Sequence, residues 1–145
     1  MKQLVLHTDG ASRGNPGPAG IGVVLQDADG ETLEEQGAFI GRKTNNEAEY
    51  QALLKGLELA AAYRPEELIV YLDSELVVRQ IQGEYRVRNA RLKPLFERVM
   101  QALSKFPKWK VAHVRRGLNK RADQLANRAI DAAEGQLNRS AGQKN

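Results

Sequence analysis

A short and almost wholly apolar run, Leu68 to Leu72, lies between two segments that have the apolar spacing of helices. Such a run is typical of a strand covered on both faces, which is how a parallel strand in the middle of a sheet is packed. The segment before it, Asn46 to Tyr63, is predicted to be a helix that stops before Pro65. The chain is therefore expected to form an α/β fold around a central parallel strand.

Further strands and helices are predicted on both sides of this run. Strand patterns cover residues 2–8, 21–26, 32–40 and 109–115, and helical patterns cover residues 92–106, residues 122–133 and a short segment that Ser74 caps and that reaches Ile81. The order β-β-β-α-β-α-α-β-α predicts a mixed five-stranded sheet with helices packed on it. We expect one domain over residues 1–134 and a polar, disordered C-terminal tail over residues 135–145.

Composition limits the chemistry that is available to the chain. Its 145 residues suit a single domain, and the absence of cysteine excludes disulfides, thiolate catalysis and cysteine-ligated metals. Any metal must bind oxygen or one of the two histidines, His7 and His113, of which His113 is expected to be packed inside the last strand. No apolar run approaches the roughly 20 residues of a membrane span, and no export signal is recognisable, so we expect a cytoplasmic protein. Nothing in the sequence suggests an obligate oligomer, so we expect a monomer.

Charge is divided unevenly along the chain. Residues 1–72 contain 6 Lys and Arg against 11 Asp and Glu, whereas residues 73–145 contain 16 against 7. A basic half beside an acidic half is expected when a polyanion is bound next to carboxylates, with cations between the two. A basic surface that is only solvated is the alternative.

Four acidic residues are predicted to meet at one edge of the sheet. Asp9 ends the first strand, Asp73 ends the fourth, and Asp123 begins the last helix. Glu49 lies in the first turn of the helix over residues 46–63, on the apolar stripe that faces the sheet. Because strand carboxyl ends and helix amino ends gather at one edge of such a sheet, these carboxylates are expected to lie close together.

Each acid also has a purely structural explanation. A turn at the Asp–Gly sequence would explain Asp9, and a capping box with Asn46 would explain Glu49. The other two acids are favourable near helix N-termini. None of these explanations accounts for the convergence of all four, because unpaired carboxylates raise one another's pKa values.

Hard divalent cations remove this repulsion. Mg²⁺ and Mn²⁺ prefer oxygen ligands, and a group of acids without cysteine or paired histidine favours them over zinc. Two such ions about 3.5–4 Å apart can activate water on one side of a phosphate and stabilise the leaving oxygen on the other. The pattern therefore predicts phosphodiester hydrolysis.

Four motifs follow one another along the chain. They are Thr8-Asp9-Gly10-Ala11-Ser12-Arg13-Gly14-Asn15-Pro16-Gly17-Pro18-Ala19-Gly20, Thr44-Asn45-Asn46-Glu47-Ala48-Glu49, Leu72-Asp73-Ser74 and Asn119-Lys120-Arg121-Ala122-Asp123. Together they resemble the motifs of type 1 ribonucleases H, over residues 2–133. The resemblance implies the ribonuclease H-like fold and endonucleolytic cleavage of the RNA strand of RNA/DNA hybrids, which leaves 5′-phosphate and 3′-hydroxyl ends.

The resemblance also implies the ligands of the metal ions. By their position in the motifs, the catalytic and metal-binding acids would be Asp9, Glu49, Asp73 and Asp123. They would hold two Mg²⁺ or Mn²⁺ ions in each active site. Asp9 and Asp73 would serve both the attacking water and the scissile phosphate, and the other two acids would complete the two coordination shells.

Six further residues would bind the hybrid by the same resemblance. The glycine-rich loop would approach the minor groove, where a backbone with few side chains can sense 2′-hydroxyl groups. Asn46 would reach bases in that groove. The remaining residues are the main chain of Ser12, Arg13 and Gly14 for the hydroxyls, and Asn15 and Thr44 for a phosphate of the DNA strand.

Three departures from the family pattern stand out. The segment before the last acid, Val114 to Arg121, is short and lacks the mobile histidine of longer members, so Arg115 or Arg116 is expected to contact the phosphate instead. The basic protrusion of some members is reduced to residues 83–93, which keep four cations without an intervening acid. Glu75 stands where many relatives have a glutamine that contacts a base.

Two other functions compete with hybrid cleavage. A module that binds hybrids without cutting them would fit the missing histidine, but it would not need the four acids. A DNA-strand recombinase or an integrase-like nuclease would fit the fold, but it would gain nothing from a loop that senses 2′-hydroxyls. The complete glycine-rich loop and the pair Asn45-Asn46 argue against the second alternative.

Overall fold

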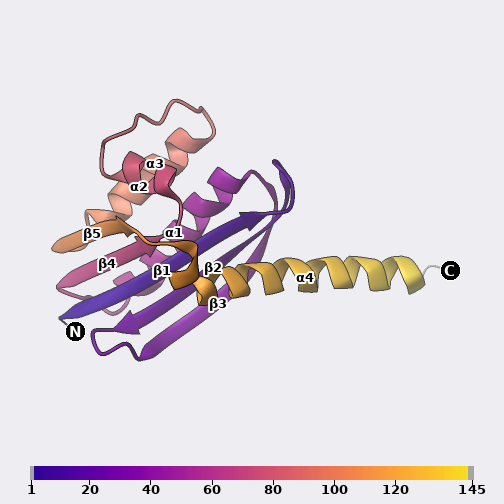
Figure 1. Cartoon of the computed structure of the whole chain (residues 1–145), viewed down its shortest axis with the longest axis horizontal. Coiled ribbons are helices and arrows are strands. Elements are labelled where there is room, and N and C mark those ends of the chain that lie inside the picture. The colour runs from indigo at the N-terminus through magenta and orange to yellow at the C-terminus, as the bar shows by residue number, and fades with distance from the viewer. Residues whose placement is uncertain (1, 144–145) are drawn as a thin grey trace.

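The computed structural model describes the backbone of residues 2–143 and the side chains of residues 2–135. Five strands and four α-helices follow in the predicted order, with one short 3₁₀ helix before the last helix (Figure 1). The strands are β1 (Gln3–Ser12), β2 (Gly17–Asp27), β3 (Thr32–Lys43), β4 (Glu67–Leu72) and β5 (Lys108–His113). The helices are α1 (Asn45–Ala61), α2 (Glu75–Ile81), α3 (Leu92–Leu103), the 3₁₀ helix η1 (Arg116–Leu118) and α4 (Lys120–Gln143).

The sheet has the strand order β3-β2-β1-β4-β5. β1, β2 and β3 pair antiparallel, whereas β4 pairs parallel with β1 on one side and with β5 on the other. The prediction of a central parallel strand from the apolar run at residues 68–72 is therefore confirmed. The mixed five-stranded sheet is the arrangement that the order of predicted strands and helices indicated.

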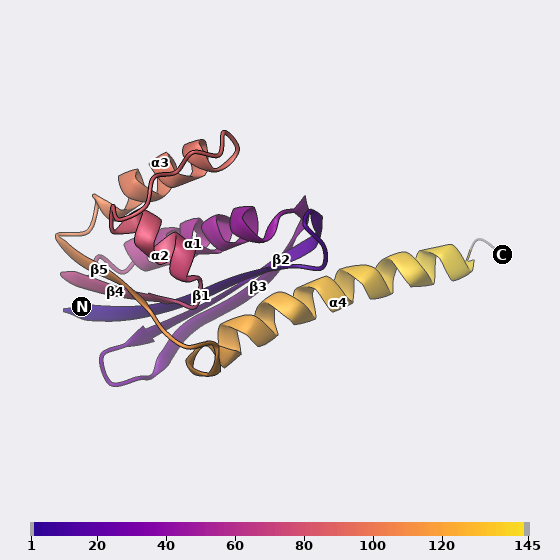
Figure 2. The same ribbon diagram turned by 45° about the horizontal axis from the view of Figure 1, so that its top comes forward.

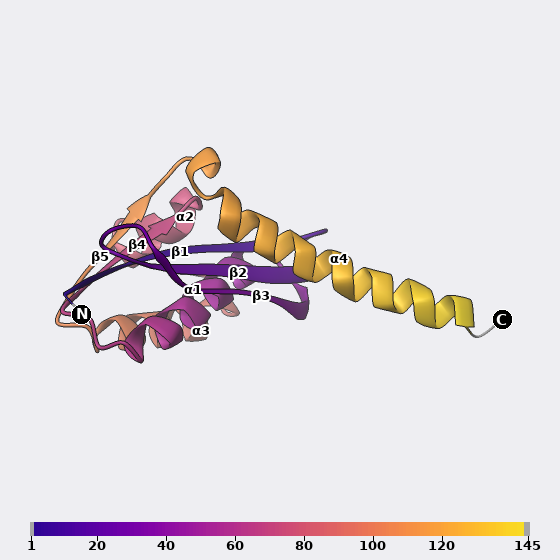
Figure 3. The ribbon, with the colours of Figure 1, turned by 90° about the horizontal axis from the view of Figure 1, so that it is seen from below.

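Helices cover both faces of the sheet. Figures 2 and 3 show α1 and α3 on one face and α4 on the other. Alternation along β1 builds the core under α1, where Leu4 and Leu6 are fully buried together with Leu53 and Leu57 of that helix. None of the helices in the described part of the chain combines the length and the apolar character that crossing a bilayer would require.

α4 lies very close to the sheet because glycines face it. A Cβ atom on Gly22 of β2 would lie 1.9 Å from the carbonyl oxygen of Ala122, and one on Gly20 would lie 2.5 Å from that of Ala126. On β3, a Cβ atom on Gly37 would lie 2.6 Å from the carbonyl oxygen of Leu125. The backbone of α4 therefore packs directly on the backbone of β2 and β3, and this contact fixes the first turn of the helix.

The structure corrects the predicted end of the last helix. α4 continues past Ala133 to Gln143, so the predicted tail at residues 135–145 begins inside this helix. Several residues after Ala133 have good helix propensity, among them Glu134, Gln136 and Leu137, which the polar composition concealed. Residues 144–145 lie outside the described part, and the disorder of the tail stays a prediction.

Candidate active site

The carboxyl ends of β1 and β4 bring two of the predicted acids together. The parallel register pairs His7 with Tyr71, so Asp9 and Asp73 lie just beyond the same end of adjacent strands. Glu49 reaches them from the first turns of α1, and one carboxylate oxygen from each of the three acids lies within 4.8 Å of the others. Asp9 and Glu49 are buried, with 5% and 7% of their surface exposed. Asp73 is partly exposed at the mouth of the site.

Glu49 is free to face the sheet because another residue caps α1. The Thr44 side chain accepts a hydrogen bond from the Glu47 amide, and the Glu47 side chain accepts one from the Thr44 amide. This is the capping box, so the alternative explanation of Glu49 as part of a box with Asn46 is wrong. Glu49 Oε1 accepts a bond of 3.3 Å from the Gly10 amide. Its Oε2 is buried without a hydrogen-bond partner among the described residues.

Burial and mutual repulsion keep protons on this pair of acids. Burial, followed by the charges of Glu49 and Asp73, raises the pKa of Asp9 to about 10. Burial and then the charge of Asp73 raise the pKa of Glu49 to about 8. Two buried carboxyls that cannot both ionise at neutral pH are unfavourable unless a cation joins them.

The free energy of unfolding of the metal-free protein is expected to fall as the pH rises from about 7 to about 9. Over this range the unfolded chain has already released protons that the folded state still holds, because the pKa values of Asp9 and Glu49 are raised. Each additional proton bound by the folded state lowers that free energy by about 1.4 kcal/mol per pH unit.

The stabilising contribution of the two protonated acids is complete below their ordinary pKa values. As the pH rises, the contributions of both acids decrease up to about pH 8, and above that pH only the contribution of Asp9 continues to decrease. Urea unfolding in EDTA at several pH values measures the slope, and saturating Mg²⁺ should flatten it. A flat profile in EDTA would contradict the prediction.

The donor set fits a divalent cation. Three carboxylates converge, one of their oxygens is buried without a partner, and the cluster contains neither histidine nor cysteine. Oxygen ligands of this kind suit Mg²⁺ or Mn²⁺. A cation among them would satisfy Glu49 Oε2 and remove the repulsion that raises the pKa values.

Asp123 lies beside this cluster rather than within it. It stands in the first turn of α4 and lines the same cavity, of about 360 Å³, as the other three acids. It also contributes to the raised pKa of Asp9. Its Oδ1 accepts a bond of 3.1 Å from the Asn127 side-chain amide. The predicted convergence of four acids is thus observed as a close group of three with the fourth at the rim.

The glycine-rich loop is fastened to the start of α1. The Ser12 amide donates to Asn45 Oδ1 at 3.0 Å, and the Asn45 amide donates to Asn15 Oδ1 at 3.2 Å. The Arg13 amide is also engaged, with the Pro18 carbonyl at 2.8 Å. Gly14 has a backbone φ of 136°, which residues with a side chain rarely adopt, so glycine is required at this point of the loop.

Relatives of known family resemble this chain closely. A family model described as reverse transcriptase-like matches residues 7–129. Ribonuclease HI from Halobacterium salinarum is 46% identical over 127 residues, which cover 88% of this chain and 64% of that protein. Ribonuclease H from Paracidovorax citrulli is 35% identical over 153 aligned positions, which cover 93% of this chain and 99% of that protein.

A solved structure agrees with these relatives. The crystal structure of LC11-RNase H1 in complex with an RNA/DNA hybrid is 45% identical, with a TM-score of 0.85 over 90% of this chain and 98% of that one. This chain belongs to the type 1 ribonuclease H family. It spans 64% of the Halobacterium relative and 36% of three mycobacterial relatives, so those proteins extend beyond the part that it matches.

Within this ribonuclease H fold, Asn46 lies between two cavities. It lines the cavity of the acids and also a second cavity, of about 150 Å³, which contains Asn15 and Thr44. Its side chain makes no hydrogen bond within residues 2–135. The structure thus brings together the residues that the family resemblance assigned to a base and to a DNA phosphate.

Sequence reasoning missed Asn89 as a residue of the second cavity and placed Arg91 only among the four cations of the basic segment. Both come from the shortened basic segment before α3. Asn89 Oδ1 accepts a bond of 2.7 Å from the Arg91 amide and so orders the start of that helix. The run of cations without an intervening acid was the available signal, but it did not indicate which of them would line the cavity of Asn15 and Thr44.

The Arg13 side chain forms ion pairs with α4 and does not line the cavity of the four predicted metal-binding acids. Its guanidinium lies 2.6 Å from Asp131 and 3.0 Å from Glu134, both on α4. The two ion pairs connect the glycine-rich loop to α4.

The structure shows where the residues lie at which the sequence departs from the family pattern. Arg116 lines the cavity of the acids, whereas Arg115 does not. Glu75 is engaged in an ion pair of 2.7 Å with Arg79. His113 ends β5 and is exposed, so the expectation that it is packed inside the strand is wrong.

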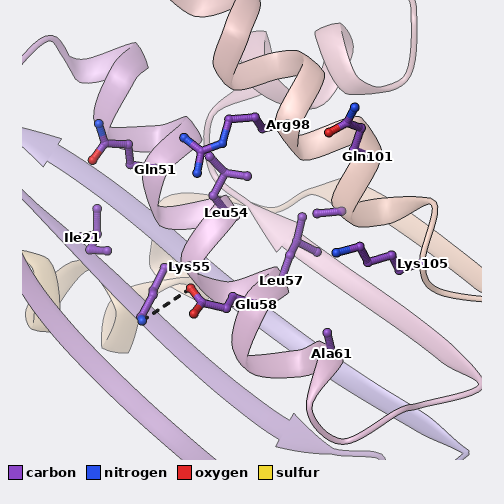
Figure 4. A pocket seen from close by; sticks show the side chains of 11 residues that line it. Ile21, Gln51, Leu54, Lys55, Leu57, Glu58, Ala61, Arg98, Gln101 and Lys105 are labelled. Atoms are coloured by element: carbon purple, nitrogen blue, oxygen red, sulfur yellow. Dashed lines mark ion pairs between the residues drawn. The ribbon is translucent and has the colours of Figure 1, made fainter.

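A larger cavity, of about 680 Å³, lies elsewhere, between α1 and α3 (Figure 4). Leu54 and Leu57 line it together with Lys55, whose ammonium lies 3.6 Å from Glu58. It contains none of the predicted site residues. The convergence of carboxylates, rather than cavity size, therefore identifies the active site.

Proposed function

We propose that this chain is an endonuclease that hydrolyses the RNA strand of RNA/DNA hybrids and leaves 5′-phosphate and 3′-hydroxyl ends. The observation that carries the proposal is the buried group of Asp9, Glu49 and Asp73, with one carboxylate oxygen lacking any partner in the described part of the chain. The hybrid bound to LC11-RNase H1 supports the choice of substrate, because that protein shares the fold and 45% of its residues with this chain.

The four acids would hold two Mg²⁺ or Mn²⁺ ions. When bound, such ions supply an activated water and neutralise charge on the leaving oxygen. Asp9 and Asp73, from adjacent strand ends, would orient both the water and the scissile phosphate. Glu49 is held by the Gly10 amide and offers its second oxygen as a ligand, and Asp123 would complete the set from the rim.

Recognition of the hybrid would rest on the loop and on the start of α1. The amides of Ser12 and Arg13 are engaged within the protein, so a 2′-hydroxyl would donate to a main-chain oxygen around Gly14. Asn46 would contact bases beside the acids. Asn15 and Thr44 would bind a DNA-strand phosphate, together with Asn89 and the positive charge of Arg91.

The Arg116→Ala substitution is expected to lower turnover about tenfold to a hundredfold. Arg116 lines the cavity of the acids, and its charge lowers the pKa of Glu49, so it stands where the family's mobile histidine is missing. Single-turnover and steady-state cleavage of a hybrid measure the change. Arg115→Ala is the matched control, and equal turnover in the two variants would remove Arg116 from this role.

The proposed activity is tested with three end-labelled substrates of one sequence: an RNA/DNA hybrid, a DNA duplex and an RNA duplex. Each is incubated with Mg²⁺, Mn²⁺ or EDTA. We expect metal-dependent cutting of the RNA strand of the hybrid. Tight hybrid binding without cutting in either metal would favour the non-catalytic module, and cutting of the DNA duplex would favour the recombinase-like alternative.

A monomeric state, a cytoplasmic location and the number of bound ions belong to the same proposal. Sedimentation of the purified protein addresses the first. A calorimetric titration with Mg²⁺ or Mn²⁺ addresses the last.

A further inference from the structure

Asn119 joins three segments that carry the acids. It is 2% exposed and lies between η1 and α4. Its side-chain nitrogen lies 2.9 Å from the Thr8 carbonyl oxygen, one residue before Asp9, and 3.4 Å from Asp73 Oδ2. Its main-chain carbonyl oxygen accepts a hydrogen bond of 3.2 Å from the main-chain amide of Asp123. Asn119 therefore contacts β1 and the end of β4 at the same point where it begins the helix of the fourth acid.

These contacts fix the orientation of the Asn119 amide. The Thr8 carbonyl can only accept hydrogen bonds, and so can an ionised Asp73 carboxylate. The NH₂ group must face both of them, which turns Oδ1 in the opposite direction. There it meets His7 Nδ1 at 3.2 Å. Because Oδ1 is an acceptor, Nδ1 of His7 must carry the proton.

His7 is held in place for this contact. Its half-buried ring packs against Tyr71 of β4, with ring centroids 5.3 Å apart. A ring held in this way, with its proton on Nδ1, is a fixed donor to Asn119.

We infer that His7 is a positioning residue for the metal site. Its Nδ1–H holds the Asn119 amide in the orientation in which Nδ2 serves Thr8 and Asp73. Without this donor Oδ1 loses its hydrogen bond, and the amide is held from one side only, by Thr8 and Asp73. The inference rests on the proposed function in one respect, which is that Asp73 is a metal ligand.

The test compares Mn²⁺ binding to the full chain and its variants by calorimetry without nucleic acid. His7→Phe keeps a ring against Tyr71 but removes the donor, and we expect the Kd for Mn²⁺ to rise about tenfold, as is usual when a partner of a metal ligand is lost. His7→Asn carries an amide nitrogen on Cγ, where the imidazole carries Nδ1, and should restore a Kd close to that of the parent. Melting temperatures show that each variant is folded.

A second measurement does not depend on metal. With only two histidines in the chain, ¹⁵N spectra of the labelled protein resolve His7 once His113→Gln has assigned the other. We expect the proton on Nδ1 in the parent and its loss from Nδ1 in Asn119→Ala. A parent ring that is protonated on Nε2 alone would overturn the inference.

The calorimetric outcomes also separate this inference from the proposed function. A parental Kd in His7→Phe, or an equal loss in His7→Phe and His7→Asn, would overturn the role of His7. Asp73→Asn is measured beside them. If Asp73→Asn binds Mn²⁺ as the parent does, the metal role of Asp73 fails, and the inference fails with it. If only Asp73→Asn loses affinity, the role of His7 alone is refuted.

Discussion

Replacing Asp9 with asparagine is expected to lower the rate of hybrid cleavage at least about a thousandfold while raising the melting temperature of the metal-free protein. The loss of rate follows from the place of Asp9 between Glu49 and Asp73, where it would ligate metal. Stabilisation of charge by bound metal is worth several kcal/mol in such reactions, which corresponds to this factor.

The expected gain in stability comes from the burial of Asp9 and not from its role as a metal ligand. Burial raises the pKa of Asp9 to about 10, so keeping this carboxyl in the folded state is unfavourable at neutral pH. Asparagine has nearly the same shape and no charge to bury. A gain of about 1 to 2 kcal/mol would raise the melting temperature by a few degrees for a domain of this size.

Two assays and one control decide the matter. Single-turnover cleavage gives the rate, and thermal unfolding in EDTA gives the melting temperature. Asp29→Asn removes an exposed carboxylate from the turn before β3 and should change neither. Retained cleavage in Asp9→Asn would exclude Asp9 from the metal site, and a lowered melting temperature would contradict the unfavourable burial of its carboxyl.

The Gly10→Ala substitution is expected to cause a large loss of stability. A Cβ atom at position 10 would lie 2.2 Å from the carbonyl carbon of Ala48 and 2.4 Å from the amide nitrogen of Glu49. Both are backbone atoms at the start of α1 and cannot move aside alone. The substitution must push β1 and α1 apart, at a cost of about 3 kcal/mol or more.

The same displacement should reduce activity. It would break the bond from the Gly10 amide to Glu49 and move that carboxylate away from Asp9. A misplacement of about 1 Å can cost roughly a hundredfold in rate. Urea unfolding and hybrid cleavage measure the two effects. Gly117→Ala, at a glycine with open space around its Cβ position, is the control for stability. Equal unfolding free energies in the two variants would contradict the close packing at Gly10.

The sequence was most informative where burial and topology act together. The apolar run at residues 68–72 predicted a central parallel strand, and the strand ends then predicted that Asp9 and Asp73 would meet. Glu49 was placed correctly because its position on the apolar stripe of α1 outweighed the capping explanation. Thr44 proved to be the cap instead, since helix starts cannot be located from sequence within a residue or two.

Contacts between segments that are far apart in the chain could not be predicted from the sequence. Asn119 was part of a recognised motif, yet its contacts with Thr8 and His7 depend on how η1 packs against β1. The position of Arg91 in the same cavity as Asn15 likewise depends on the path of the segment before α3. The end of α4 was predicted too early, because the polar composition after Ala133 concealed residues of good helix propensity.

The direct backbone contact of α4 with β2 and β3 affects how the chain tolerates change. Gly20, Gly22 and Gly37 take no part in the proposed chemistry, and each faces a carbonyl oxygen of α4. Any side chain at these positions would shift the helix that carries Asp123. In a library of random variants selected for activity, these glycines should tolerate as little replacement as the acids themselves. A position that tolerates no replacement in such a library would then be required either for the close packing of α4 on the sheet or for the reaction itself.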